Sequence, residues 1–186
     1  LALTWNPGFC RQSANHDRFQ CDPGNRFGFV LHGLWPDGRG AAWPQYCAPA
    51  PRIPEAVVRR TLCAMPSPAL QRHQYAKHGS CSGLPPAAYF DRAREAYAAI
   101  RYPDMDSLSR RPGLTAGQLA AAVARVNPGM TPAMLRVQAG GDRWLDELWV
   151  CLDTRFRPRP CPAHQRGLPA HVPPRIPPGR QVPSLP

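Results

Sequence analysis

Short apolar runs near the two ends of the chain enclose a long central region with helical patterns. The apolar runs are bounded by Pro, Gly or Asn, as strands often are, and lie at residues 1–5, 27–34, 133–139 and 144–153. The tripeptide Gly140-Gly141-Asp142 separates the last two runs. This spacing predicts that they form a β-hairpin.

Four helices are predicted between these strands, at residues 54–65, 67–78, 85–100 and 115–126. The second has the clearest boundaries, because Ser67 is a favourable N-cap, Pro68 suits the first turn and Gly79 ends the pattern. Strands at both ends with helices clustered between them predict an α+β domain.

The remaining segments are predicted to be irregular, and the 186 residues to form a single domain. Residues 11–25 are a polar loop between Cys10 and Cys21, and residues 158–186 are rich in Pro and Arg, typical of an irregular coat or a loose tail. No apolar run approaches the roughly 18 residues that a membrane span needs, so no membrane association is expected. Because the chain starts at Leu1 without a basic and apolar leader, we expect a mature or trimmed form that has lost any signal peptide.

Composition adds a candidate partner. A hydrophobic content of 43% with 19% charged residues indicates a globular protein. The formal net charge of +11 favours a polyanionic partner, with nucleic acid first and an anionic cell surface second. The alternative is a cation-rich surface that serves only solubility.

The cysteines indicate an oxidising compartment. There are seven, and none falls in a Cys-x-x-Cys pair, which argues against a zinc ribbon or a thioredoxin-type site. We expect three disulfides and one odd thiol, as in secreted or periplasmic proteins. Spacing alone does not fix the pairing.

The candidate chemistry is concentrated in residues 73–80, which read His-Gln-Tyr-Ala-Lys-His-Gly-Ser. On a helix, His73 and Lys77 form one stripe and Gln74 and His78 form the next, so that the four line one wall of a cleft. His32, at the end of a predicted strand, could form the opposite wall. Two imidazoles and an ammonium on a basic protein suit RNA cleavage without a metal, because one imidazole can accept a proton, the other can donate one, and the cation offsets charge on the phosphoryl oxygens.

Two less specific interpretations remain open. Histidines at this spacing occur by chance on surface helices, and a lone strand histidine is usually structural. A metal site formed by His73, His78 and Cys81 is the other alternative, although a five-residue spacing splays the two imidazoles.

Two segments resemble the active-site segments of the ribonuclease T2 family. They are residues 29–37, Phe-Val-Leu-His-Gly-Leu-Trp-Pro-Asp, and residues 73–81, which end in Cys81. Supporting matches lie at residues 3–10, 43–47 and 148–153, and the start of the chain looks most like the bacterial branch. The resemblance implies a disulfide-stapled α+β fold with a central antiparallel sheet flanked by helices, and a secreted or periplasmic protein that we expect to be monomeric.

The family's chemistry is metal-independent transphosphorylation of single-stranded RNA to 2′,3′-cyclic phosphate ends, with no cofactor. The resemblance matches His32 and His78 to the acid–base pair, Lys77 to the cation that stabilises the transition state, and His73 to a phosphate-binding imidazole. In the commonest family assignment the His78 match is the base and the His32 match is the acid; the sequence does not decide between this and the reverse. RNA is required because DNA lacks the attacking 2′-hydroxyl.

The main departure from the family is Gln74, which stands where the family usually has glutamate. Glutamine keeps the size and can donate a hydrogen bond to a phosphoryl oxygen, but it adds no negative charge. We therefore also consider an attenuated family member that binds RNA or another polyanion without cleaving it, or a deliberate exchange that traps substrate.

The resemblance also implies a base-binding site and a disulfide pattern. Trp35, Asp37 and Trp43 match the family's main base site, where stacking gives low base specificity. The implied disulfides are Cys10–Cys21, Cys47–Cys81 and Cys151–Cys161. They leave Cys63 free, as a small buried residue in the helix that precedes the active site.

Overall fold

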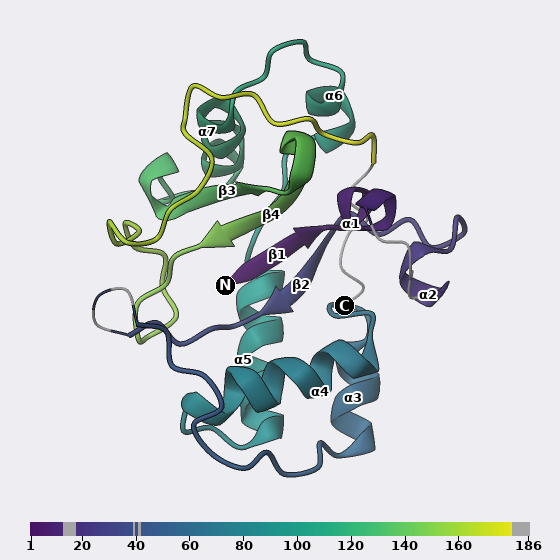
Figure 1. Cartoon of the computed structure of the whole chain (residues 1–186), viewed down its shortest axis with the longest axis vertical. Helices are drawn as coiled ribbons and strands as arrows, with labels where there is room; N and C mark the ends of the chain where they lie inside the picture. The colour runs from purple at the N-terminus through teal and green to yellow at the C-terminus, as the bar shows by residue number, and fades with distance from the viewer. Residues whose placement is uncertain (13–17, 39, 41, 180–186) are drawn as a thin grey trace.

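The fold is built on a four-stranded antiparallel sheet with the strand order β2-β1-β4-β3 (Figure 1). The computed structural model describes residues 1–12, 18–38, 40 and 42–179. The strands are β1 (Ala2–Trp5), β2 (Phe29–Gly33), β3 (Leu135–Ala139) and β4 (Leu145–Val150). All four predicted strands are confirmed with shorter bounds, and β3 and β4 pair as the predicted hairpin. The α+β fold class with a central antiparallel sheet is therefore correct.

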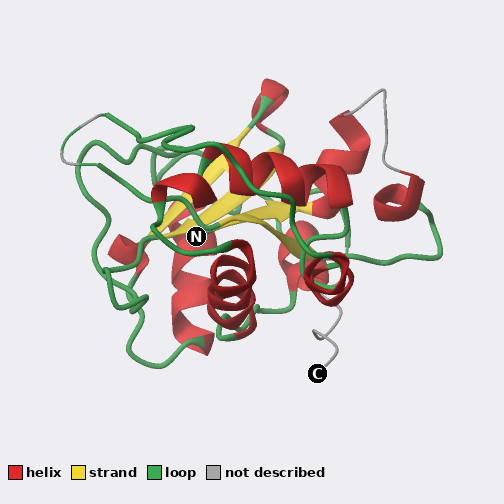
Figure 2. Ribbon diagram, turned by 90° about the horizontal axis from the view of Figure 1, so that it is seen from below, coloured by secondary structure: helices red, strands yellow, loops and turns green. Residues whose placement is uncertain are grey.

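Helices surround the sheet, which lies in the middle of the molecule when seen from below (Figure 2). In Figure 1, α3, α4 and α5 gather below β2, and α7 lies beside β3. The α-helices are α1 (Asn6–Gln12), α2 (Arg18–Cys21), α3 (Glu55–Thr61), α4 (Pro68–Lys77), α5 (Pro86–Ala98), α6 (Met105–Ser109) and α7 (Ala116–Val126). Three short 3₁₀ helices are η1 (Gly79–Cys81), η2 (Pro132–Met134) and η3 (Gly141–Arg143).

The four predicted helices are α3, α4, α5 and α7. The helices α1, α2 and α6 were not predicted. Helix α1 starts with Asn6-Pro7-Gly8, which by composition indicates a turn, and α2 and α6 are too short to show a period. Part of the predicted loop 11–25 is thus helical, and residues 13–17 lie outside the described part of the chain.

The two faces of the sheet differ in character. Leu3 on β1 pairs with Leu31 on β2 and with Leu148 on β4, and all three are fully buried in the hydrophobic core. Thr4, the next residue, pairs with Glu147 on β4 and points to the opposite face, because side chains alternate along a strand. The sheet therefore presents its core to one side and a polar face, which carries Glu147, to the other.

Helix α5 holds β2 at both ends through tyrosine hydroxyls. Tyr97 Oη donates to the carbonyl of Phe29 at 2.9 Å, and Tyr89 Oη donates to the carbonyl of Leu34 at 2.9 Å. These buried bonds fix the strand that carries His32 against the helical layer.

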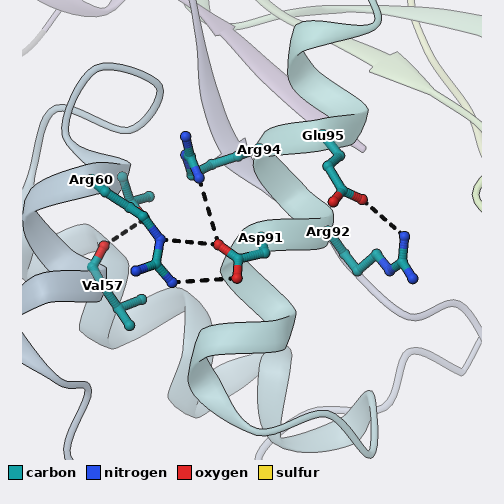
Figure 3. A network of polar contacts seen from close by, with 7 residues as sticks. Val57, Arg60, Asp91, Arg92, Arg94 and Glu95 are labelled. Carbon is teal, nitrogen blue, oxygen red and sulfur yellow. Dashed lines mark hydrogen bonds and ion pairs between the residues drawn. The ribbon is translucent and has the colours of Figure 1, made fainter. Parts of the chain in front are cut away.

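Surface ion pairs join α3 to α5 (Figure 3). Asp91 on α5 accepts from Arg60 on α3 at 3.1 and 3.3 Å, and Arg94 lies 3.5 Å from the same carboxylate. On the same helix, Arg92 donates to Glu95 at 2.9 Å. Because these groups are largely exposed, each pair is worth at most about 1 kcal/mol, and the buried contacts of α5 hold the layer in place.

All three disulfides implied by the family resemblance are present: Cys10–Cys21, Cys47–Cys81 and Cys151–Cys161. Cys63 is free, as expected, but its environment was predicted wrongly. It lies in the turn after α3 and is exposed, because the helix ends at Thr61.

The Pro- and Arg-rich segment is irregular, as predicted, and its described part (158–179) is a coat and not a loose tail. It follows the sheet, where Leu168 N donates to the carbonyl of Val137 and Leu145 N donates to the carbonyl of Arg175, both at 2.8 Å. The indole of Trp5 donates to the carbonyl of Pro177 at 3.1 Å. Within the described residues, no helix has the length and apolar character needed to cross a membrane.

Candidate active site

His32 occupies an irregular position in β2. Its neighbours Leu31 and Gly33 pair with Leu3 and Ala2, which are adjacent on β1, so His32 is the extra residue of a β-bulge. A bulge turns a strand locally and re-aims a side chain, and bulges occur frequently beside active sites. The bulge places a half-buried imidazole on the polar face of the sheet.

Helix α4 supplies the other candidate groups. The hydroxyl of Ser67 caps it by accepting from Leu70 N at 3.3 Å, and His78 is its C-cap residue. The predicted stripes are recovered with different burial: Gln74 and His78 are buried at 2% and 5% exposure, whereas Lys77 is half-buried and His73 is exposed. Exposure thus increases from the stripe of Gln74 and His78 to the stripe of Lys77 and His73, which lies nearer the solvent.

The indole of Trp35 contacts both candidate acid–base imidazoles. It stacks on His78 with ring centroids 5.0 Å apart and meets His32 edge-on at 5.1 Å. The centroids of the two imidazoles can therefore be no further apart than the sum of these two distances. Trp35 Nε1 donates to Gln74 Oε1 at 2.6 Å, which fixes the indole.

Gly33 makes this arrangement possible. A Cβ at this position would overlap both Trp35 Nε1 and Gln74 Oε1. The backbone of β2 therefore approaches the hydrogen bond between these two side chains as closely as only glycine allows.

His78 is held in a site that disfavours its charged form. Burial, with smaller contributions from the charges of Lys77, His32 and His73, lowers the pKa of His78 to about 4. Its Nδ1 is buried with no hydrogen-bond partner among the described residues. His78 is therefore neutral over most of the pH range, with Nε2 as the nitrogen left for a ligand.

His32 has the opposite environment, because its Nδ1 contacts the carboxylate of Glu147 on β4. The same carboxylate accepts from Trp149 Nε1 at 2.5 Å and from Thr4 Oγ1 at 3.4 Å. Burial acts to raise the pKa of Glu147, but the hydrogen bond and charge of His32, with the bonds from Trp149 and Thr4, outweigh it and lower that pKa. Glu147 is therefore an anion beside His32.

Sequence analysis did not single out Glu147. One signal was available: Asp146 and Glu147 are adjacent acids inside an otherwise apolar strand of a strongly basic chain. A buried acid is uncommon unless it has a partner, so two acids in this strand indicate a buried ion pair.

The candidate base-site residues surround one cavity of about 480 Å³, which His78 also lines. Trp35, Asp37 and Trp43 all reach it, and Trp43 is 41% exposed with its ring 5.9 Å from that of Trp149. The predicted base-site residues and the candidate catalytic residue His78 thus line the same cavity.

The C-terminal coat contributes to this cavity, which was not predicted. Asp37 Oδ2 is bound by His164 Nε2 at 2.9 Å and by Gln165 Nε2 at 3.1 Å. Gln165, Phe156 and Arg159 line the cavity. No sequence signal in this Pro-rich segment indicated such a role.

The alternative metal site of His73, His78 and Cys81 is not formed, because the Cys81 sulfur is bonded to Cys47. Among the described residues there is no group of three or more His, Cys, Asp or Glu side chains arranged to hold a metal ion. The disulfide instead joins the loop that carries Trp43 to the end of α4.

The sequence profile of the Ribonuclease T2 family matches residues 1–161. The chain belongs to the ribonuclease T2 family. The matched range contains both histidine segments and all three disulfides. His164 and Gln165, which bind Asp37, lie beyond it.

Bacterial relatives support the assignment to the ribonuclease T2 family. A probable ribonuclease of Haemophilus influenzae is 29% identical over 174 residues, covering 87% of this chain and 59% of that protein. A ribonuclease of Aeromonas hydrophila is 31% identical over 158 residues, covering 82% of this chain and 70% of that protein. Ribonuclease I of Escherichia coli is 33% identical over 131 residues, covering 48% of each chain. This chain therefore spans only part of each of these proteins.

Solved structures of low sequence identity share the fold. Trichomaglin, described as an S-like ribonuclease, aligns with a TM-score of 0.69 at 20% identity, covering 93% of this chain and 94% of its own. An RNase-related protein from Calystegia sepium also aligns at 0.69, with 18% identity and coverage of 91% and 92%. RNase NT, solved in complex with 5′-AMP, aligns at 0.66 with 20% identity, covering 93% of this chain and 96% of its own.

Replacement of Gly33 tests the packing of the site. Gly33→Ala should lower the free energy of unfolding by about 1–3 kcal/mol, because the new methyl group must displace Trp35 or Gln74. Urea unfolding measures the loss. Gly141→Ala is the matched control, since a Cβ there would meet open space. Equal stability of the two variants would show that the Trp35–Gln74 contact is not as close as described.

The lowered pKa of His78 predicts a pH-dependent stability. Between about 4 and the ordinary value of 6.5, the unfolded state binds a proton that the folded state does not. Stability should therefore fall as the pH falls through this window, and His78→Gln should remove part of that slope. Urea unfolding across the window, with the exposed His171→Gln as control, measures it. Identical slopes for wild type and His78→Gln would contradict the assigned environment.

Proposed function

We propose that this chain is an endoribonuclease that cleaves single-stranded RNA by metal-independent transphosphorylation and leaves 2′,3′-cyclic phosphate ends. The observation that carries the proposal is a pair of imidazoles that both contact Trp35, one held neutral and the other paired with a carboxylate. An acid and a base in different surroundings, both able to reach one linkage, are what this reaction needs. The ribonuclease names of the bacterial relatives support it.

His78 is assigned as the general base. Its pKa of about 4 leaves it neutral and able to accept the proton of the 2′-hydroxyl through Nε2. The deprotonated O2′ then attacks phosphorus, a P–O2′ bond forms, and the bond from phosphorus to the 5′-oxygen breaks.

His32 is assigned as the general acid, which gives a proton to the departing 5′-oxygen. The Glu147 carboxylate offers a full negative charge to the imidazolium form of His32. This order of acid and base agrees with the commonest assignment in the family.

Lys77 and His73 are assigned to the phosphate. Both lie on α4, four residues apart, and the charges of both act on His78, which supports this assignment. The Lys77 ammonium would stabilise the additional charge of the pentacoordinate transition state, and the exposed His73 would bind a phosphate oxygen.

The base next to the scissile phosphate is assigned to the cavity of Trp35, Asp37 and Trp43. An exposed indole can stack on any base, which supports broad specificity. We further propose that Asp37, already bound by His164 and Gln165 through Oδ2, is oriented by the C-terminal coat toward the base.

Gln74 is assigned a supporting role in the site. Its Oε1 is already engaged by Trp35, so it holds the indole that contacts both imidazoles. A glutamate would retain this acceptor, and its replacement by glutamine removes a negative charge beside His78. Low activity caused by this change is the basis for the alternative function as an RNA-binding protein.

The disulfides support a secreted or periplasmic location. Three bridges form and persist only where the environment is oxidising.

Cleavage of polymeric RNA in the presence of a chelator tests the proposal. We expect 2′,3′-cyclic phosphate ends, and a loss of about 10²–10⁴-fold in rate for His32→Ala and for His78→Ala. His171→Ala, an exposed histidine of the coat, is the matched control and should retain the wild-type rate. RNA that is bound in a salt-dependent manner but stays intact would support the binding alternative instead, and loss of cleavage on chelation would contradict a metal-independent reaction.

A further inference from the structure

Glu147 is a buried carboxylate whose two oxygens are both engaged. Oε1 contacts His32 Nδ1 and accepts from Thr4, and Oε2 accepts from Trp149 Nε1 at 2.5 Å. Its side chain is only 10% exposed. A carboxylate held at both oxygens cannot rotate, so it provides a fixed acceptor for the imidazole.

The sheet places His32 and Glu147 side by side. Thr4 pairs directly with Glu147 across β1 and β4, and His32 bulges from β2 on the other side of β1. The register of β4 also shifts beside Glu147, since Gln138 pairs with Glu147 and Ala139 with Leu145. Register irregularities at β2 and β4 thus flank the contact between His32 and Glu147, which are 115 residues apart in the chain.

A fixed acceptor on Nδ1 decides what the other ring nitrogen can do. With its Nδ1 proton bound to Glu147, His32 is held in one ring orientation, and Nε2 is the nitrogen that can meet a substrate. In hydrolases with a Ser-His-Asp triad, a buried carboxylate acts on its histidine in this way, by holding tautomer and orientation.

We propose that Glu147 is a positioning residue that acts through His32, holding Nδ1 so that Nε2 faces the leaving 5′-oxygen. The inference rests on the proposed function, because it gives His32 a proton to deliver. Trp149 extends the arrangement to the base cavity, since its indole binds Glu147 and also lies 5.6 Å from Trp35 and 5.9 Å from Trp43.

The test compares Glu147→Gln with His32→Ala on two substrates. One is a dinucleoside monophosphate, whose 5′-oxygen must be protonated as it leaves. The other is a nucleoside 3′-(4-nitrophenyl phosphate), whose nitrophenolate leaves without a proton. On the dinucleoside, Glu147→Gln should lower kcat about 10²-fold with KM little changed.

Glu147→Gln must reproduce the leaving-group pattern of His32→Ala. If His32 is the acid, both variants regain most of their rate on the nitrophenyl ester, whereas His78→Ala does not. In the His32→Ala background, Glu147→Gln should cause no further loss, since a residue that acts through His32 has nothing left to position.

Glu95→Gln is the matched control, because it makes the same exchange at an exposed carboxylate of α5 that pairs with Arg92 and has no contact with His32 among the described residues. It should keep the wild-type kcat on both substrates. Urea unfolding of Glu147→Gln separates a loss of fold from a loss of positioning.

Three results would overturn the inference. The first is a wild-type kcat for Glu147→Gln on the dinucleoside. The second is an equal loss of rate for Glu147→Gln on both substrates while His32→Ala is rescued on the nitrophenyl ester, and the third is a further loss when Glu147→Gln is added to His32→Ala. Failure of the proposed function is recognised separately. A fully active His32→Ala variant would contradict the acid–base pair itself, whereas an inactive His32→Ala variant with an active Glu147→Gln variant contradicts the role of Glu147 alone.

Discussion

The site depends on a difference between two imidazoles in the surroundings of their Nδ1 atoms. Nδ1 of His32 meets a buried carboxylate, and Nδ1 of His78 is buried with no partner among the described residues. Burial and three nearby cationic groups keep His78 neutral. One fold therefore gives one histidine a carboxylate partner and keeps the other neutral, and such a difference in surroundings is the general means by which acid and base chemistry coexist at a single pH.

This difference is built by the sheet and the helices together. The bulge in β2 moves His32 out of the regular pairing, and Gly33 lets the strand approach Trp35 and Gln74. The indole of Trp35 then contacts both the strand residue His32 and the helix-terminal residue His78. Loss of this indole would remove a packing contact from both imidazoles without changing either of them.

Sequence analysis predicted the features that depend on local signals. Ser67 and Gly79 bounded α4 correctly, and the resemblance gave the disulfides and the family. Features that depend on distant pairing were missed. Glu147 has its partner 115 residues away, and Asp37 is bound by a histidine 127 residues away, so no local pattern reported either contact. The exposure of Cys63 was missed because α3 ends earlier than its apolar pattern indicated.

The unequal state of the two imidazoles can be measured directly by NMR of protein labelled with ¹⁵N in its histidines, titrated from neutral to acidic pH. His78 should stay neutral until the pH approaches about 4, and His32 should show a proton on Nδ1 that is hydrogen-bonded to a carboxylate. Titration of His78 near its ordinary value of 6.5, or a His32 ring whose Nδ1 carries no bound proton, would contradict this account of the site.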